Sequence, residues 1–290
     1  MQKGLIGVQM MMLKDKVEQD GIYEVLRRLS ELGYHAVEVS QIDMTREVIE
    51  GLKQGCKDFE FTIAALSCGV EDLAEGYKYP GDTLQNDFDK IVEDCHELDC
   101  SILRIGMLPM NYMGSLELVM DFTRKCEEYA TRLKAKGIDL YYHAHHMEFH
   151  KYDGKFLLEI MRENTVNLGF ELDSHWMWRG GVDPIRYIPT FAGRIRAIHL
   201  KDYRIAQVDM DKYPGNGREK VFYMFNHIVQ YAEVGEGTLP MPEIIAAGLE
   251  SGSEFFLIEQ DEQYGRDPYD CLVTSRDNLI HMGFAEWFRA

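Results

Sequence analysis

Eight short apolar segments, separated by amphipathic stretches, recur along the whole length of the 290-residue chain. Each is brief and mostly apolar, which is the pattern of a strand covered on both faces of a sheet. Eight such strands alternating with helices over this length predict an α/β protein, a (β/α)8 barrel forming a single domain over residues 1–290. The segments are residues 5–11, 35–40, 61–68, 101–106, 139–146, 168–173, 195–202 and 255–261.

The stretches between these segments carry helical signals. Residues 20–33 place apolar side chains at i, i+3, i+4 and i+7 spacing and end in a glycine, and residues 116–137 and 153–164 behave similarly. Asp183-Pro184 and Asp267-Pro268 predict two further helix starts, with Asp as the cap and Pro in the first turn. A doubly wound open sheet is the alternative, but it usually shows a Gly-rich phosphate loop after its first strand, and none is present.

One connection breaks the regular spacing. About 60 residues separate His199 from Glu259, where roughly 35 suffice for one repeat of such a barrel. The surplus at about 203–232 is aromatic and punctuated by Gly and Pro, and it predicts a long loop insertion on the face where barrel strands end. Such a loop serves as a lid or partner surface, or else packs as a plain surface excursion.

Composition excludes several classes of protein. Against 31 Lys and Arg stand 49 Asp and Glu, so the net charge of −18 disfavours binding to nucleic acid or to an anionic membrane surface. No apolar run approaches the 18 or more residues of a membrane span, and the N-terminus lacks the pattern of a signal peptide. Six cysteines without a CxxC pair argue against zinc ribbons and disulfide frameworks, and predict reduced thiols in a cytoplasmic protein.

Metal-competent side chains gather at the ends of the last four strands. In a barrel these ends converge on one mouth, so residues far apart in sequence should meet there, and Glu38 on the second strand is expected to face the same mouth. Carboxylates and imidazoles without thiolates suit Mn²⁺, Mg²⁺, Co²⁺ or Zn²⁺, and a cation would relieve repulsion among the carboxylates. The side chains are His143, His145, Glu148, Asp173, His175, His199, Asp202, Glu259 and Asp261.

Five segments in the second half of the chain resemble the xylose isomerase-like barrel family of sugar isomerases, epimerases and inosose dehydratases. They are YYHAHHMEF (141–149), GFELDSHWMWRGGVDP (169–184), GRIRAIHLKDY (193–203), EVGEGTLPMPEII (233–245) and FFLIEQDEQYGRDPYDCLVTSRDNL (255–279). The resemblance implies the barrel fold and one divalent ion, with Mn²⁺ expected, held by Glu148, Asp173, His199 and Glu259. Many relatives carry a Glu on strand five where this chain has His143, so the strand-five ligand is either His143 or Glu148.

Such an ion would act as a Lewis acid on a substrate carbonyl and its neighbouring hydroxyl, stabilising the enediolate formed by proton abstraction. Proton transfer is assigned to His143, His145 and Glu259, with Lys201 steadying an oxygen. The predicted function is therefore a metal-dependent isomerase or epimerase acting on a sugar or cyclitol. The residues predicted to contact substrate are Glu38, His175, Trp176 and Arg179.

Three alternatives stay open at this point. A lyase of the same superfamily, inosose dehydratase-like or cleaving 3-oxo-glycosides, shares the first half-reaction and is compatible with a small partner subunit. A non-catalytic assembly subunit would use the insertion as its docking surface, and a homo-oligomer is equally compatible with the sequence. An apurinic-site endonuclease shares the fold but needs a positively charged groove, which the net charge disfavours.

Overall fold

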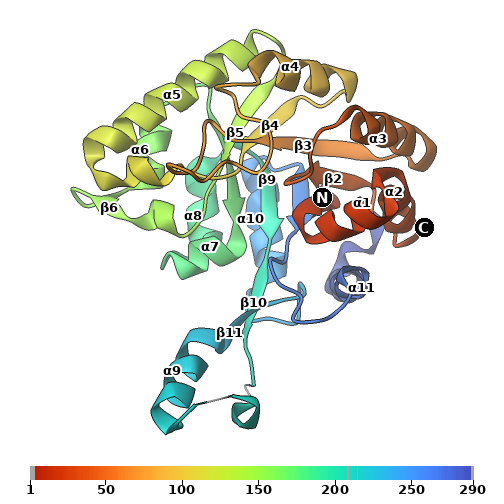
Figure 1. Cartoon of the computed structure of the whole chain (residues 1–290), viewed down its shortest axis with the longest axis vertical. Helices are drawn as coiled ribbons and strands as arrows, with labels where there is room; N and C mark the ends of the chain where they lie inside the picture. Colours follow the sequence, from red (N-terminus) through yellow and green to blue (C-terminus); the bar gives the residue numbers. More distant parts are fainter. Residues whose placement is uncertain (1–3, 208, 214, 289–290) are drawn as a thin grey trace.

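Eight parallel strands close into a barrel in the computed structural model, which describes residues 4–207, 209–213 and 215–288. The order around the barrel is β1-β12-β9-β8-β5-β4-β3-β2, and the predicted single-domain (β/α)8 fold is confirmed (Figure 1). The strands are β1 (Leu5–Gln9), β2 (Ala36–Val39), β3 (Thr62–Cys68), β4 (Ile102–Ile105), β5 (Asp139–His143), β8 (Gly169–Asp173), β9 (Ile195–Leu200) and β12 (Phe255–Ile258).

Six strands end earlier than the apolar segments predict, and β1, β5, β9 and β12 do so by two or three residues. β1 stops at Gln9 because the Gln9 side chain accepts a hydrogen bond from the Met11 amide and caps the short helix that follows. β5 ends at His143 and β12 at Ile258, so the polar residues after them belong to loops at the barrel mouth.

Helices surround the barrel (Figure 1). The predicted caps are confirmed, since the side chains of Asp183 and Asp267 accept from the amides of Ile185 and Tyr269. The α-helices of the repeats are α1 (Lys14–Asp20), α2 (Ile22–Glu31), α3 (Arg46–Phe59), α4 (Phe88–Glu97), α5 (Leu116–Lys134), α6 (Leu157–Glu163), α7 (Ser174–Arg179), α8 (Pro184–Tyr187), α10 (Met241–Ser251) and α11 (Pro268–Leu279). Short 3-10 or π turns are η1 (Met10–Leu13), η2 (Met110–Gly114), η3 (Met147–Phe149), η4 (Ile188–Phe191), η5 (Met210–Lys212), η6 (Ile280–Phe284) and η7 (Ala285–Trp287). None of the helices in the described part of the chain is both long enough and apolar enough to span a bilayer.

The helix predicted from residue 153 begins at Leu157. The preceding residues form a small antiparallel hairpin of β6 (Lys151–Tyr152) and β7 (Lys155–Phe156). Asp153 and Gly154 connect its strands with positive φ angles of 50° and 86°, as a two-residue hairpin turn requires.

Along each strand, side chains point alternately into and out of the barrel, so the inward-pointing residues form layers inside it. Ala36, Tyr141 and Ala197 pack together in a small apolar cluster inside the barrel. A Cβ at Gly169 would lie 2.3 Å from the Tyr141 ring, so only glycine lets this tyrosine fill the space. Two residues further along each strand, the inward positions become charged or imidazole side chains, which therefore lie nearer the mouth.

Within the insertion at 203–232, the described residues form a hairpin with a helix. β10 (Asp202–Ile205) pairs antiparallel with β11 (Val229–Ala232), and α9 (Gly217–His227) lies between them in the chain. It extends away from the barrel (Figure 1), and α9 has no buried residues. Its base is fixed by Asp202, whose carboxylate accepts from the amides of Tyr203, Gly235, Gly237 and Leu239.

Candidate metal centre

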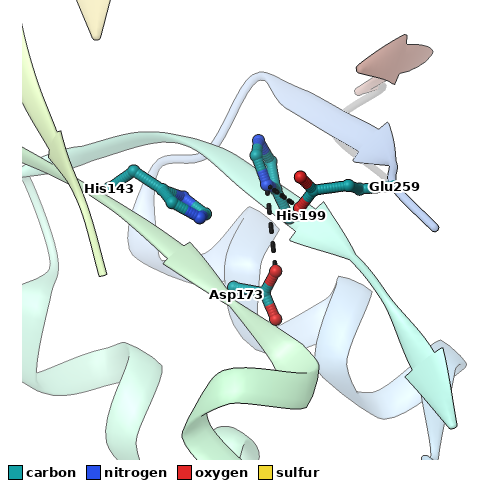
Figure 2. A group of neighbouring side chains, drawn as sticks. All are labelled: His143, Asp173, His199 and Glu259. Carbon is teal, nitrogen blue, oxygen red and sulfur yellow. Dashed lines mark hydrogen bonds and ion pairs between the residues drawn. The ribbon is translucent and has the colours of Figure 1, made fainter. Parts of the chain in front are cut away.

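Four side chains from four neighbouring repeats meet at the mouth of the barrel. His143 ends β5, Asp173 ends β8, His199 lies in β9, and Glu259 directly follows β12. All four are buried, and each offers one ligand atom within 4.8 Å of the others (Figure 2). Because β5, β8, β9 and β12 are consecutive in the barrel, their ends bring these atoms together without any loop rearrangement.

The distances within this group leave atoms that a cation would satisfy. His199 Nδ1 lies 2.8 Å from Glu259 Oε2 and 3.8 Å from Asp173 Oδ2. Among the described residues, Asp173 Oδ2 and His143 Nε2 have no hydrogen-bond partner although both are buried. A buried polar atom without a partner is costly. Two imidazoles and two carboxylates form a donor set suited to Mn²⁺, Co²⁺ or Zn²⁺, and these residues therefore fit a divalent ion.

A second layer of charge supports this group from below. Arg104 Nε lies 2.6 Å from Glu171 Oε2 and 3.2 Å from Glu38 Oε1, and all three side chains are buried. The same Glu171 oxygen lies 3.1 Å from His143 Nδ1 and 3.2 Å from His199 Nε2. Glu171 thus lies against both imidazoles on the side away from the cluster, and His199 Nε2 also makes a hydrogen bond of 3.3 Å with Glu38 Oε2. These contacts orient the rings and leave the other nitrogen of each ring to bind a metal.

Arg104 and Glu171 lie in this candidate site, and the sequence analysis missed both. Glu171 stands two positions before Asp173 in β8, and Arg104 occupies an inward position of β4. A charged residue in an otherwise apolar strand, two positions from a predicted ligand, is the signal that identifies Glu171. Arg104 had a weaker signal, since no metal-competent residue follows it on β4.

Burial and neighbouring charges raise the pKa of some side chains in the two layers and lower the pKa of others. Burial raises the pKa of Asp173 to about 8 and that of Glu38 to about 7. Burial acts in the same direction on Glu259, but the charges of Lys201 and His199 hold the pKa of this carboxyl well below its usual range. Burial, with Arg104 beside it, lowers the pKa of His143 to about 3, so this imidazole is neutral, as a metal ligand must be.

Glu148 does not join the cluster. Its Oε1 accepts a hydrogen bond of 2.5 Å from the Tyr142 hydroxyl, and its Oε2 accepts one of 2.8 Å from the His145 amide. These contacts hold the carboxylate within its own loop, where burial raises its pKa to about 7. Of the two strand-five candidates, the structure thus brings His143, not Glu148, to Asp173, His199 and Glu259.

A cavity of about 580 Å³ opens over the cluster. Only some of the residues predicted to act on or contact substrate line it. His145, Trp176, Lys201 and Glu259 line this cavity. Glu38 does not, because it is fully buried below the cluster against Arg104. His175 and Arg179 line a separate cavity of about 400 Å³ between α7 and the hairpin insertion.

A sequence model of the family described as "xylose isomerase-like TIM barrel" matches residues 26–272, which is most of the chain. The chain belongs to this family. The resemblance noted from the five segments is thereby confirmed, whereas no curated protein sequence matches the chain significantly.

Solved structures agree on the fold. A sugar phosphate isomerase/epimerase from Parabacteroides distasonis superposes with a TM-score of 0.71 at 19% identity, covering 98% of this chain and 96% of that one. An L-ribulose 3-epimerase gives 0.67 at 13% identity, covering 99% and 96%. A xylose isomerase-like barrel protein from Mycobacterium smegmatis, solved in complex with magnesium, gives 0.60 at 13% identity and covers both chains fully. At these identities the likeness shows the shared barrel.

Proposed function

We propose that the protein is a divalent-metal-dependent sugar isomerase or epimerase that abstracts a proton next to a substrate carbonyl. The observation that carries this proposal is the convergence of His143, Asp173, His199 and Glu259, with unsatisfied buried atoms, beneath a cavity that also presents His145 and Lys201. The names of two structural neighbours, a sugar phosphate isomerase/epimerase and an L-ribulose 3-epimerase, support the same class of reaction.

The four clustered residues would hold the ion, and Mn²⁺ is our proposed occupant, with Mg²⁺, Co²⁺ and Zn²⁺ as substitutes. When bound, it supplies Lewis-acid stabilisation of the negative charge that develops on neighbouring substrate oxygens. The protein's own contribution begins below it, where Glu171 and Arg104 fix the two imidazole rings. Gln9 adds to this by donating a 2.9 Å hydrogen bond to Glu259 Oε1.

Proton transfer falls to groups that line the cavity. Burial, with His143 and Lys201 nearby, holds the pKa of His145 well below 6.5, so at neutral pH its imidazole is in the unprotonated form that a general base needs. Its Nδ1 has no hydrogen-bond partner among the described residues. Lys201 Nζ lies 3.1 Å from Glu259 Oε2 and 2.5 Å from Asp261 Oδ1, where it can donate to a substrate oxygen that becomes negative. Trp176 offers an apolar face to sugar C–H groups.

The test is solvent deuterium incorporation into a panel of ketoses, aldoses, inososes and 3-oxo-glycosides. We expect exchange in the Mn²⁺-loaded protein, loss of exchange in His145→Ala with Mn²⁺ binding retained, and no change in His150→Ala, an exposed histidine outside the cavity. Return of the proton to the same carbon or to its neighbour distinguishes epimerase from isomerase. Loss of a β-substituent would identify the lyase alternative. No exchange across the panel in metal-replete protein would refute the proposal.

A further inference from the structure

The cavity above the metal centre has two unlike walls. Lys201, Glu259 and Asp261, which follow β9 and β12, form a polar wall. The loops after β3, β4 and β5, together with η1, form an apolar wall. β3, β4 and β5 are consecutive in the barrel, as are β9 and β12, so the loops that follow them face each other across the mouth, whereas η1 follows β1 beside β12. The apolar wall consists of Met11, Leu73, Tyr77, Met107, Met110 and Met147.

This apolar wall is open to a ligand. Tyr77 is 64% exposed and Met110 is 44% exposed, so both retain large apolar surfaces beside the reacting groups. Methionine side chains adapt to irregular shapes and make favourable sulfur contacts with aromatic rings. A cavity of about 580 Å³ falls in the range that encloses drug-sized ligands, so it has room for more than one sugar ring.

Each cationic side chain of the lining already has carboxylate partners. Among the described residues, the Lys and Arg side chains that line the cavity are Arg104 and Lys201. Arg104 faces two carboxylates, those of Glu38 and Glu171, and Lys201 faces those of Glu259 and Asp261. A phosphate group in this cavity would find no cation that lacks a carboxylate partner and would lie close to anionic side chains.

We infer that the substrate is an uncharged oxo-sugar or oxo-cyclitol that bears an aromatic substituent, and not a sugar phosphate. Its carbonyl-bearing ring faces the polar wall, and the substituent packs on the methionine-rich wall. This inference rests on the proposed function for the reacting half of the substrate. The apolar wall itself is tested by binding, without turnover.

The binding experiment is calorimetric titration of the Mn²⁺-loaded protein with three probes: methyl glucoside, phenyl glucoside and glucose 6-phosphate. We expect phenyl glucoside to bind about tenfold or more tightly than methyl glucoside, because its ring is buried against the apolar wall. Glucose 6-phosphate should bind no more tightly than methyl glucoside. Equal affinity for the phenyl and methyl compounds, or a preference for the phosphate, overturns the inference.

Two matched variants test whether the aromatic substituent packs on the apolar wall. Met110→Ala should remove most of the preference for the phenyl compound and leave the affinity for methyl glucoside unchanged. Leu116→Ala is the control, since Leu116 is 37% exposed on α5 and does not line the cavity. An unaltered phenyl preference in Met110→Ala would count against the assigned wall.

Exchange measurements with the 3-oxo forms of the same glycosides separate the two proposals. Exchange with equal kcat/KM for the methyl and phenyl compounds supports the proposed function and contradicts the inference that the substrate bears an aromatic substituent. Tighter binding of the phenyl compound with no exchange from either oxo form supports the apolar subsite and contradicts the reaction.

Discussion

Replacing Glu171 by Gln should weaken metal binding while the protein stays folded. The carboxylate oxygen Oε2 faces three donors at once, Arg104 Nε at 2.6 Å, His143 Nδ1 at 3.1 Å and His199 Nε2 at 3.2 Å. A glutamine whose amide oxygen takes this place still faces the three donors, but it carries no negative charge, so each of these contacts loses its ionised acceptor and weakens.

The expected loss follows from what such supporting contacts contribute. Mutation of a carboxylate that supports a ligating imidazole typically lowers metal affinity about 10- to 100-fold, or about 1.4 to 2.7 kcal/mol. The variant also loses one charge-assisted hydrogen bond to Arg104, which costs about 1.5–3 kcal/mol of a typical stability of about 5–15 kcal/mol. Glu38 still faces Arg104 at 3.2 Å, so the guanidinium is not left alone and the fold should survive.

Calorimetric titration with Mn²⁺, together with urea unfolding, checks this expectation. Glu254→Gln is the matched control, because Glu254 also pairs with an arginine, accepting two hydrogen bonds from Arg196, but does so on the exposed surface. The control should bind Mn²⁺ like the wild type and lose about 1 kcal/mol or less. A folded Glu171→Gln protein with wild-type affinity for Mn²⁺ would refute the assignment of Glu171 as the carboxylate that supports the two ligating rings.

Three further substitutions test the rest of the site. Asp173→Asn should abolish Mn²⁺ binding and proton exchange yet keep the fold, because its amide oxygen can still accept from the Trp176 amide; stoichiometric Mn²⁺ in the calorimeter would contradict this. Arg104→Met should cost about 3–5 kcal/mol in urea unfolding, since it leaves two buried carboxylates without their cation; a loss below about 1 kcal/mol would disagree. Glu148→Gln should bind Mn²⁺ normally. Because burial raises the pKa of Glu148 from 4.5 to about 7, the folded wild type keeps a proton that the unfolded chain releases, so its stability should fall by up to about 3 kcal/mol from pH 4.5 to 7. Glu148→Gln should lack this fall in stability. Identical profiles of stability against pH for this variant and the wild type would contradict the raised pKa of Glu148.

The strands and the clustering of the candidate ligands could be predicted because both depend on short-range patterns. Apolar segments and Asp-Pro caps locate the elements, and the barrel topology then carries every strand end to one mouth. Asp173, His199 and Glu259 lie within or next to their strands, so their positions followed directly. The choice between His143 and Glu148 could not be made, because Glu148 lies beyond β5, where strand alternation no longer applies.

Other features depend on contacts that a linear sequence does not display. The pairing of Arg104 with Glu171 joins residues 67 positions apart, and it exists only because β4, β5 and β8 are neighbours in the closed barrel. The helix in the insertion was predicted only as part of a loop. α9 buries none of its residues, so it has no amphipathic face from which a helix could be predicted.

Two stacked layers of charge at the barrel mouth are neutralised differently. Both layers contain a group of side chains with metal-ligating geometry. In the lower one, Glu38 and Glu171 share the guanidinium of Arg104, which occupies the position that a cation would otherwise take. In the upper one, the ammonium of Lys201 lies within 3.9 Å of three carboxylates, those of Asp173, Glu259 and Asp261. Ionised, these three would leave an excess of two negative charges where burial makes uncompensated charge costly. A divalent cation matches that excess, which is why we assign the metal to the upper layer and a supporting role to the lower one.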